Sequence, residues 1–435
     1  MTRKQTRRDF LRKTSAGTAA LAVGAVGTQA FAIRRPGGNP LETIRIGVVG
    51  TGGRGGGACS DNLHGNDNVK IVAMADLVPS KCKRLRDGLA KKRGPEKVDV
   101  SDDRIYSGLD GYEKIIGAKD IDVVFLTTPP GFRPPYLEAA VAAKKHVFAE
   151  KPVCVDPAGY RACLRAHEQA EKQGTAIVTG TQYRRQTSFL KAIELIHGGK
   201  IGKPIAATAR YCSSGIWYRG RKDGMSGTRY QIHNWMHFVW LSGDQITEQA
   251  VHNIDAMNWV FGGPPESAYG SGGRFTRPAD SEMWDSASID YTYPGNRLLS
   301  FACRQIPGTA SDVHNVVYCQ GGIAYINAMN GGSRIVDEQG KEILKVKGDI
   351  RAAYWQEHKD LIASIRAGKP IVELKETANS SLTAVMGRMA AYTGRKVSWD
   401  FAANESKLDL FPKSLSLDAD MTSHGHAVPG RSKLV

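Results

Sequence analysis

The chain has 435 residues, of which 41% are hydrophobic and 23% are charged, and its formal net charge at pH 7 is +16. This length predicts two or three domains, and the ordinary apolar content excludes disorder for most of the chain. The longest weakly polar segment, residues 16–32, is shorter than the roughly 20 apolar residues that a membrane-spanning helix needs, so a membrane span is also excluded.

The first 32 residues have the order of an export signal. A basic head with the pair Arg7-Arg8 comes first, a weakly polar core follows, and Ala30-Phe31-Ala32 supplies a small-x-small cleavage site. This order resembles that of a twin-arginine leader and predicts a periplasmic or otherwise exported protein. Residues 33–43 are expected to form an arm that precedes the first domain.

A glycine-rich loop follows the first predicted strand, residues 43–49. The loop carries the G-x-G-x-x-G pattern directly after a strand, where the glycines allow a tight turn and a close approach of the backbone to a pyrophosphate. The pyrophosphate then lies at the positive end of the next helix. The residues expected to bind a dinucleotide here are Gly50, Gly52, Gly53, Arg54 and Gly55.

A second strand, residues 69–76, ends in an acidic residue at the position of a ribose contact. Asp76 follows the glycine loop by about 20 residues, where a carboxylate accepts hydrogen bonds from the ribose hydroxyls. Its negative charge would repel the 2′-phosphate of NADP, so the sequence favours NAD. NADP stays open as an alternative, because Arg54, Lys81 and Lys83 could offset that repulsion.

Three further strands, at residues 122–128, 145–150 and 176–180, alternate with helical segments. This alternation predicts a doubly wound parallel sheet. Ligands of such sheets bind beyond the carboxyl ends of the strands, which is where Thr128-Pro129-Pro130 and Glu150-Lys151-Pro152 lie. The expected cofactor-binding residues therefore also include Thr128, Pro129, Glu150 and Lys151.

These motifs together resemble those of the glucose-fructose oxidoreductase/inositol dehydrogenase family, often written Gfo/Idh/MocA. The resemblance rests on the glycine loop, on Thr128-Pro129-Pro130 and on the segment 145–152 that ends in Glu-Lys-Pro. It implies an α/β fold with an N-terminal Rossmann domain, here residues 44–183, built on a doubly wound parallel sheet. It also implies a C-terminal α/β domain for substrate binding and oligomerisation, here residues 184–400, with an open, largely antiparallel sheet.

The resemblance implies a catalytic role for Lys151, because the lysine of this motif touches the substrate oxygen next to the carbon that exchanges hydride. It also implies that an acid and a histidine four residues later face the substrate, and these are Glu248 and His252. Many family members have aspartate in place of Glu248. Histidine is suited to take the hydroxyl proton near neutral pH, and Asp255, one turn further on, could orient it.

Simpler interpretations stay open at two of these positions. Lys151 could do no more than pair with Glu150, and His252 could be a buried core histidine. Arg133 stands where relatives with a Thr-Pro-Pro loop usually have histidine, which puts the packing around the cofactor in doubt. Tyr183, after the last parallel strand, resembles a family position near the substrate.

From residue 201 the pattern changes to longer alternating runs, which predict an antiparallel sheet. These runs lie at residues 205–211, 287–293, 298–304 and 313–318. Residues 212–243 form an insertion rich in aromatic and basic side chains, which could be a lid that binds a sugar or the core of a helix. The candidates for substrate contacts are Tyr183, Arg219, Tyr230, His233 and Asp255.

No metal site is expected. His233 and His237 have the i, i+4 spacing of two zinc ligands on a helix, but Asn234 replaces the glutamate of a His-Glu-x-x-His motif. Packing or hydrogen bonding is therefore favoured for these histidines. The seven cysteines form no C-x-x-C pair, which argues against a disulfide framework and against a thiolate metal site.

The chain ends in a late helix, residues 377–393, which could pack back on the Rossmann domain, and in residues 401–435, which have no clear periodicity. We expect these last residues to be an extended C-terminal tail. This tail or the arm at residues 33–43 could wrap a neighbouring subunit of a homo-oligomer, a dimer or a tetramer.

The sequence thus predicts an exported NAD(P)-dependent oxidoreductase that moves hydride between nicotinamide and a secondary alcohol or ketone of a sugar, polyol or sugar derivative. Because free NAD is scarce outside the cytoplasm, the cofactor should stay tightly bound. The alternatives are an NAD-dependent glycoside hydrolase that acts by transient oxidation and elimination, and a non-catalytic sugar-binding protein. A small-molecule carbohydrate is the expected partner, and the scattered positive charge argues against nucleic acid.

Overall fold

A computed structural model of the chain describes residues 42–328 and 331–435. The predicted leader, residues 1–32, and most of the predicted arm lie outside the described residues. Within the described part of the chain, no helix is long and apolar enough to cross a membrane.

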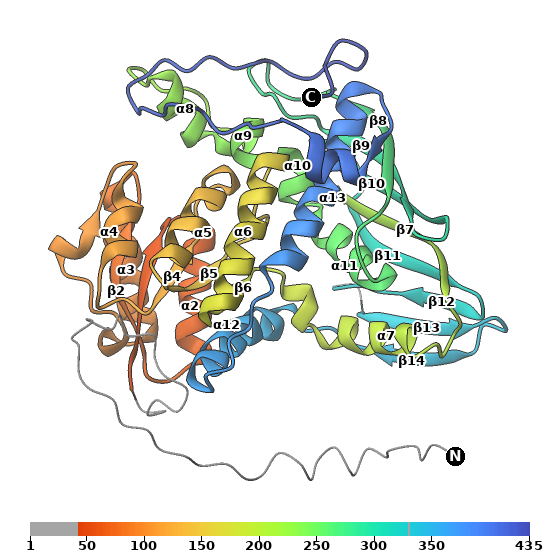
Figure 1. Cartoon of the computed structure of the whole chain (residues 1–435), viewed down its shortest axis with the longest axis horizontal. Helices are drawn as coiled ribbons and strands as arrows, with labels where there is room; N and C mark the ends of the chain where they lie inside the picture. The colour runs from red at the N-terminus through yellow and green to blue at the C-terminus, as the bar shows by residue number, and fades with distance from the viewer. Residues whose placement is uncertain (1–41, 329–330) are drawn as a thin grey trace, which may run out of the picture. The chain divides into compact units, whose positions relative to one another are not determined.

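The first half of the described chain is built on a six-stranded sheet with the order β3-β2-β1-β4-β5-β6, in which all neighbours pair in parallel (Figure 1). Its strands are β1 (Ile44–Val49), β2 (Val69–Ala75), β3 (Ile105–Tyr106), β4 (Val123–Leu126), β5 (His146–Ala149) and β6 (Ile177–Thr179). The strands are mostly apolar, with Arg45 and Lys70 near the start of β1 and β2, as expected for a parallel sheet that helices cover on both faces. The strand order reverses between β1 and β4, and a ligand crevice is expected at that point.

Six α-helices of the described chain accompany this sheet. They are α2 (Gly53–Gly65), α3 (Pro79–Arg93), α4 (Gly111–Gly117), α5 (Arg133–Ala142), α6 (Pro157–Gln173) and α12 (Ile350–Arg366). The sequence sets the ends of α6, because the Asp156 carboxylate accepts a hydrogen bond from the Gly159 backbone N–H at 2.6 Å and Gly174 ends the helix with a φ of +72°. Helix α12 comes from much later in the chain and packs against α2 and β6.

The second half contains a nine-stranded sheet with the order β14-β13-β12-β11-β7-β10-β9-β8-β15. Its strands are β7 (Pro204–Ser213), β8 (Ser267–Gly273), β9 (Ser286–Tyr293), β10 (Arg297–Gln305), β11 (Asp312–Cys319), β12 (Gly322–Tyr325), β13 (Ser333–Asp337), β14 (Glu342–Val346) and β15 (Val397–Ser398). The neighbours pair antiparallel except β7 and β10, which are parallel. This confirms the predicted fold class, a Rossmann sheet followed by a largely antiparallel sheet.

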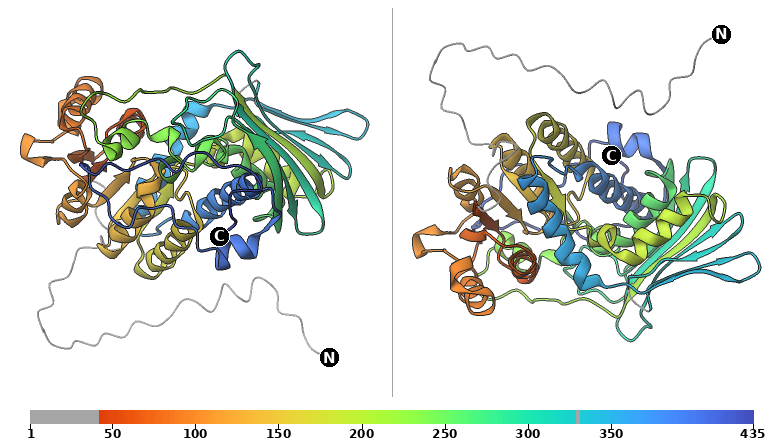
Figure 2. Two further views of the ribbon diagram at one scale, coloured as in Figure 1. Left: turned by 90° about the horizontal axis from the view of Figure 1, so that it is seen from above. Right: turned by 90° about the horizontal axis from the view of Figure 1, so that it is seen from below.

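Helices cover one face of the nine-stranded sheet (Figure 2). The remaining α-helices are α7 (Thr187–His197), α8 (Gly227–His233), α9 (Val239–Ser242), α10 (Asp244–Glu248), α11 (Val251–Phe261) and α13 (Leu374–Thr393). Short helical turns occur at η1 (Pro95–Lys97), η2 (Asp102–Arg104), η3 (Pro130–Phe132), η4 (Gln182–Arg185), η5 (Trp235–His237) and η6 (Phe401–Glu405). Helix α13 contacts α6 of the first half as well as β8 and β9 of the second, so it joins the two sheets.

The tail beyond η6, residues 406–435, contains no helix or strand but packs along its own chain (Figure 1). Its Leu410 N–H donates to the Asp156 carboxylate at 2.8 Å, and the Trp284 indole N–H donates to the Ala427 carbonyl at 3.1 Å. The ring of Phe411 packs edge-on against Phe132, next to the parallel sheet. These contacts attach the tail to the rest of its own chain.

Candidate active site

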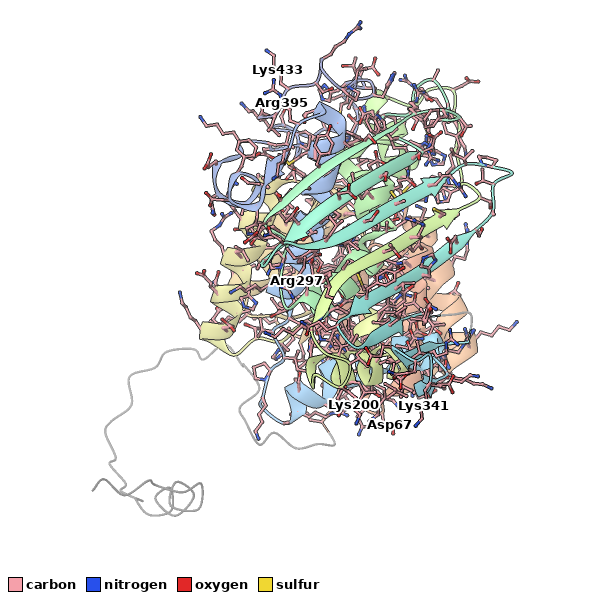
Figure 3. All side chains as sticks on the ribbon, turned by 90° about the vertical axis from the view of Figure 1, so that its right-hand side faces the viewer. Asp67, Lys200, Arg297, Lys341, Arg395 and Lys433 are labelled. Atoms are coloured by element: carbon pink, nitrogen blue, oxygen red, sulfur yellow. The ribbon has the colours of Figure 1, made fainter. Side chains whose placement is uncertain are left out.

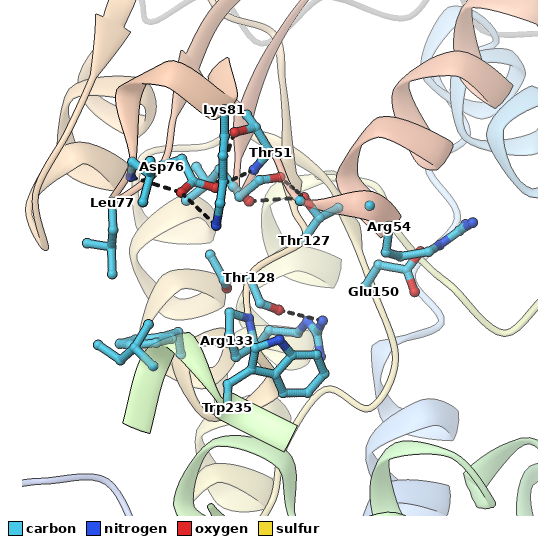
Figure 4. Close-up of a pocket in the computed structure, with 18 of the residues that line it drawn as sticks. Thr51, Arg54, Asp76, Leu77, Lys81, Thr127, Thr128, Arg133, Glu150 and Trp235 are labelled. Carbon is cyan, nitrogen blue, oxygen red and sulfur yellow. Dashed lines mark hydrogen bonds and ion pairs between the residues drawn. The ribbon is translucent and has the colours of Figure 1, made fainter. Parts of the chain in front are cut away.

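A cavity of about 970 Å³ lies at the carboxyl ends of the parallel strands, and both halves of the chain line it (Figure 4). One group of lining residues follows β2 and β3 and comprises Asp76, Leu77, Val78, Lys81, Arg84, Leu85, Gly108, Leu109 and Tyr112. A second group comprises Lys151, Gln182, Tyr211, Glu248, Gln249, His252 and Tyr354. The glycine loop and the residues Thr127, Thr128 and Pro129 after β4 also line the cavity.

The glycine loop forms an open cradle at the start of α2. Gly50 has a φ of +95°, and a Cβ atom there would lie 2.8 Å from the backbone of Thr127, so only glycine fits. Gly55 packs beneath the loop, where a Cβ would lie 2.1 Å from the Gly50 carbonyl oxygen. A Cβ at Gly52 or Gly53 would meet nothing within 4 Å. The loop backbone thus faces free space at the positive end of α2, as the pyrophosphate of a dinucleotide requires.

Asp76 is fixed at the end of β2 by backbone and side-chain donors (Figure 4). Its carboxylate accepts hydrogen bonds from the Thr51 N–H at 2.9 Å, from the Thr51 hydroxyl at 3.2 Å and from the Val78 N–H at 3.0 Å. The Lys81 ammonium lies 3.8 Å from it. Since a carboxylate has about four acceptor sites, Asp76 can still accept a bond from a ribose hydroxyl.

Arg54 and Glu150, both expected to bind the cofactor, form an ion pair with each other in the wall of the cavity. The Arg54 Nε donates to the Glu150 Oε1 at 2.5 Å, and the other side of the guanidinium lies 3.5 Å from Glu357 of α12. The guanidinium also lies over the Tyr354 ring at 4.5 Å. Burial, and then the charge of Glu150, raise the pKa of Glu357 well above its ordinary value. Arg54 and Glu150 both line the cavity, but their charges are paired with each other.

Lys151 follows β5 and points to α10. Its ammonium donates to the Glu248 backbone carbonyl at 2.5 Å and to the Glu248 Oε1 at 3.1 Å. The alternative that Lys151 pairs with Glu150 is therefore wrong, because Glu150 pairs with Arg54. An ammonium has three N–H donors, so one remains for a ligand in the cavity.

His252 lies close to Glu248 in sequence but not on the same helix, since α10 ends at Glu248 and α11 begins at Val251. Its ring packs on Tyr183 with the centroids 5.1 Å apart. Among residues 42–328 and 331–435, no group hydrogen-bonds to either ring nitrogen, and the residue lines the cavity. Burial, and then the charges of Lys151 and Arg54, lower the pKa of His252 well below its ordinary value. The imidazole is therefore neutral at pH 7 and can accept a proton.

Two expected substrate residues lie behind the site. Asp255 does not orient His252, because its carboxylate accepts hydrogen bonds from Arg184 Nε at 2.9 Å, Arg184 Nη2 at 2.8 Å and the Ser380 hydroxyl at 2.8 Å. A bidentate arginine pair is a stronger partner than a neutral imidazole. Tyr183 is buried beneath His252 and does not line the cavity.

The insertion 212–243 is partly cavity wall and partly core. Arg219 and His233 line the cavity. Tyr230 is buried and donates a hydrogen bond to Asp280, so it does not reach a ligand. The ring nitrogens of His237 lie 2.9 Å from the Ser281 hydroxyl and 2.9 Å from the Trp217 carbonyl oxygen, and they are thereby engaged.

Arg133 joins the two loops that carry the sequence motifs. Its guanidinium donates to the Thr128 carbonyl at 2.7 Å (Figure 4). It also donates to the Pro152 carbonyl at 2.6 Å. Burial lowers its pKa to about 10. The only sign of this role in the sequence was an arginine at a position where relatives usually have histidine.

Sequence reasoning also missed the polar side chains near Lys151 and His252. The Tyr211 hydroxyl donates to Gln249 Oε1 at 3.2 Å, and Gln182 Nε2 donates to the Tyr354 hydroxyl at 3.1 Å. They come from β7, η4, α12 and the turn after α10, so no local motif contains them. Together they give this end of the cavity amide and phenol groups that suit a polyhydroxylated ligand.

Two family models match the chain. Residues 44–180 match a model described as an oxidoreductase family with an NAD-binding Rossmann fold, and residues 189–325 match the GFO/IDH/MocA C-terminal domain.

Relatives include the inositol 2-dehydrogenase of Rubrobacter xylanophilus, 23% identical over 291 residues, or 67% of this chain and 73% of that protein. The myo-inositol 2-dehydrogenase of Thermotoga maritima is 23% identical over 337 residues, or 75% of this chain and 90% of that protein. A solved structure of scyllo-inositol dehydrogenase from Lactobacillus casei, with bound NAD(H) and scyllo-inositol, covers 82% of this chain and 99% of its own with a TM-score of 0.62. At 18% identity this likeness shows a shared fold.

Proposed function

The chain belongs to the Gfo/Idh/MocA family of NAD-binding oxidoreductases, and on this premise we propose that it moves hydride between NAD and a secondary alcohol or ketone of a polyol, sugar or sugar derivative. One observation carries the proposal. The pair of Lys151 and Glu248 and the neutral imidazole of His252 line the same cavity as the glycine loop. The inositol dehydrogenases among the relatives support a polyhydroxylated substrate.

The described residues fit a nicotinamide dinucleotide. The open backbone at Gly52 and Gly53 would hold the pyrophosphate, and the Asp76 carboxylate would accept from the adenosine ribose. Asp76 favours NAD over NADP, because its negative charge would repel a 2′-phosphate and, among the described residues, Lys81 at 3.8 Å is its one ionic partner. When bound, the nicotinamide ring supplies the hydride acceptor or donor.

Proton transfer belongs to the side chains of the chain itself. The free N–H of Lys151 would donate to the substrate oxygen and stabilise its developing negative charge. The neutral His252 would accept the hydroxyl proton during oxidation and return it during reduction. Glu248 holds the Lys151 ammonium at this position, so we assign it a positioning role through two contacts.

Export by the twin-arginine route, with the cofactor already bound, is a further part of the proposal. It is supported by the arginine pair, weakly polar core and cleavage pattern in residues 1–32. Cell fractionation of the full-length protein and of an Arg7→Lys, Arg8→Lys variant tests it. The full-length protein should reach the periplasm and the variant should stay in the cytoplasm.

We further propose a homo-oligomer formed through the uncovered face of the nine-stranded sheet, whose strands cross the front of Figure 3. Leu298 and Tyr318 both pair with Ala206, so all three side chains lie on one face, and the first two are exposed. Tyr269, on the same face, is 58% exposed. Light scattering of the purified protein tests this, and the proposal predicts a dimer or a tetramer.

The experiment that tests the enzymatic function uses the full-length protein and a panel of inositols, aldoses and glycosides. We expect an inositol or sugar to change the redox state of NAD, with Lys151→Ala lowering kcat by about a hundredfold or more. The matched control is Lys172→Ala on the exposed side of α6, which should keep full activity. Cleavage of a glycoside without net change of NAD would instead support the elimination-based hydrolase.

A further inference from the structure

Helix α8 of the insertion lies at the Asp76 end of the cavity. Figure 1 shows α8 above α4 and α5, far from the strands of the second sheet. His233, its last residue, has a pKa lowered by partial burial and by the charges of Arg219, Lys222 and Lys81, and Lys81 is the residue that pairs with Asp76. Ile232 and His233 of the insertion line the same cavity as Asp76 and Lys81. We therefore take the insertion to cover the adenosine end of the cavity, beside the Asp76 carboxylate.

Apolar side chains border this end of the cavity on two sides. Leu77 and Leu109 come from the loops after β2 and β3, and Met225, Ile232 and Leu417 come from the insertion and the tail. All five are half-buried, so each keeps apolar surface toward the cavity. A flat aromatic base next to the ribose site would lie between these two apolar surfaces and bury both of them.

The tail holds α8 in place through its backbone. The Ser226 hydroxyl donates to the Leu417 carbonyl, and the Gly227 N–H donates to the Asp420 carboxylate at 2.8 Å. A Cβ on Gly227 would lie 2.2 Å from the Met421 carbonyl oxygen, so the two segments touch without space for a side chain. The further bonds are from Thr228 N to the Ala419 oxygen at 3.2 Å, from Gln231 Nε2 to the Met421 oxygen at 3.1 Å and from Arg229 Nη2 to Asp418 at 3.0 Å.

We propose that residues 225–235 and Leu417 form an adenosine clamp, which binds the adenine ring of the dinucleotide against the loops after β2 and β3. This inference rests on the proposed NAD-dependent function. The insertion and the C-terminal tail, which lie outside the parallel sheet, thus enclose the adenosine half of the cofactor. Release of the cofactor therefore requires α8 and the tail to move together. Such a clamp suits a cofactor that must stay bound during export.

The test uses the full-length protein with two disrupting variants and one matched control. Gly227→Ala forces the tail away from α8, and Leu417→Ala removes an apolar contact without a backbone clash. Gly220→Ala is the control, because a Cβ at this position of the same insertion meets nothing within 4 Å. Affinities for NAD⁺, ADP-ribose and nicotinamide mononucleotide are measured by calorimetry, and NADH release by stopped-flow fluorescence.

We expect both disrupting variants to weaken NAD⁺ and ADP-ribose binding by about tenfold or more and to speed NADH release to a similar extent, whereas Gly220→Ala matches the wild type. Nicotinamide mononucleotide should bind equally to all. If Leu417→Ala, with an unchanged melting temperature, leaves ADP-ribose binding intact, the clamp is overturned. If that variant raises only the KM of the polyol, the segment is a substrate lid and the clamp is likewise overturned. If the wild type binds no NAD⁺, the proposed function itself fails, and the clamp fails with it.

Discussion

The ammonium group of Lys151 contacts Glu248 at two atoms, the backbone carbonyl oxygen at 2.5 Å and the carboxylate Oε1 at 3.1 Å. The carbonyl contact depends on the end of α10, whereas the carboxylate contact depends on the side chain. Substitution of Glu248 therefore removes the carboxylate contact but keeps the carbonyl contact. Its effect on the rate measures the positioning of Lys151 separately from the chemistry that Lys151 performs.

Glu248→Ala should lower kcat by about tenfold to a hundredfold, because it removes a charge-assisted hydrogen bond to Lys151 but keeps the carbonyl contact. Glu248→Gln keeps an oxygen acceptor and should lower kcat less. Steady-state kinetics with the polyol identified in the activity screen measure both effects. An equal loss in both variants would mean that the negative charge matters and that the hydrogen bond does not.

The activity should fall on the acidic side only well below pH 6.5. Burial and the charges of Lys151 and Arg54 lower the pKa of His252 well below its ordinary value, and the protonated ring cannot accept the hydroxyl proton. The rate of oxidation thus stays constant as the pH falls to about 6.5 and is lost as the pH passes through the lowered pKa. A pH profile of kcat/KM measures this. An acidic limb centred at or above about pH 7 would contradict the assignment of His252 as the base.

His358 should make folding sensitive to acid. It is fully buried beside Phe125 and Phe148, and within the described chain neither ring nitrogen has a hydrogen-bond partner. Burial, and then Arg54 and Arg185, lower its pKa well below 6.5, so between the two pKa values only the unfolded state binds the proton. Its contribution to stability is therefore complete above about pH 6.5 and is lost as the pH falls.

The variant His358→Phe isolates this contribution. Relative to the wild type, it should gain up to about 1.4 kcal/mol of unfolding free energy per pH unit as the pH falls below about 6.5. Urea denaturation at several pH values gives the difference. The exposed His64→Phe change is the control, and parallel pH curves for the wild type and His358→Phe would refute the prediction.

The Arg133 guanidinium should matter for stability as well as for the site. Arg133→Ala leaves the buried carbonyl group of Pro152 and the partly buried carbonyl group of Thr128 without their donors, and we expect the unfolding free energy to fall by about 2–5 kcal/mol. Arg165→Ala breaks only the exposed pair with Glu138 and should cost less than about 1 kcal/mol. Chemical denaturation compares them, and equal losses would show that Arg133 is not a structural tie.

Structural features that depend on residues close together in the chain could be predicted from the sequence. The glycine loop was predictable because the tight turn at Gly50 depends on local backbone conformation. Asp76 was predictable because the apolar run of β2 places the next residue at the edge of the sheet. The Glu-Lys-Pro segment follows β5 by the same argument. The fold class followed from the alternation of these elements.

Contacts between elements that are distant in the sequence could not be predicted, because the partner of each side chain depends on how the elements pack and on which charges must be compensated. Glu357, on α12, contacts one side of the Arg54 guanidinium, and Glu150 binds the other side. No local sequence pattern identifies Glu357 as a partner of Arg54. Asp255 is three residues from His252 but binds Arg184, since a bidentate ion pair outweighs proximity in the chain. The tail shows no periodicity because it contacts α8 mainly through backbone groups, which any sequence carries.

Asp76 should decide the choice of cofactor. Its carboxylate accepts hydrogen bonds from Thr51 and Val78 and faces the cavity, and its one ionic partner in the described part of the chain is Lys81, at 3.8 Å. Asp76→Ser removes the charge that repels a 2′-phosphate and leaves Lys81 free to attract one. We expect the affinity for NAD⁺ to fall by about tenfold and that for NADP⁺ to rise by at least as much.

Calorimetric titration with NAD⁺ and NADP⁺ measures this exchange of preference. Asp87→Ser on the exposed side of α3 is the matched control, because it removes an equal charge from a residue outside the cavity. Its preference should equal that of the wild type, since an exposed charge is screened over about 8–10 Å at physiological salt. If Asp76→Ser lowers both affinities equally, the carboxylate only supports the loop through Thr51, and the preference for NAD has another origin.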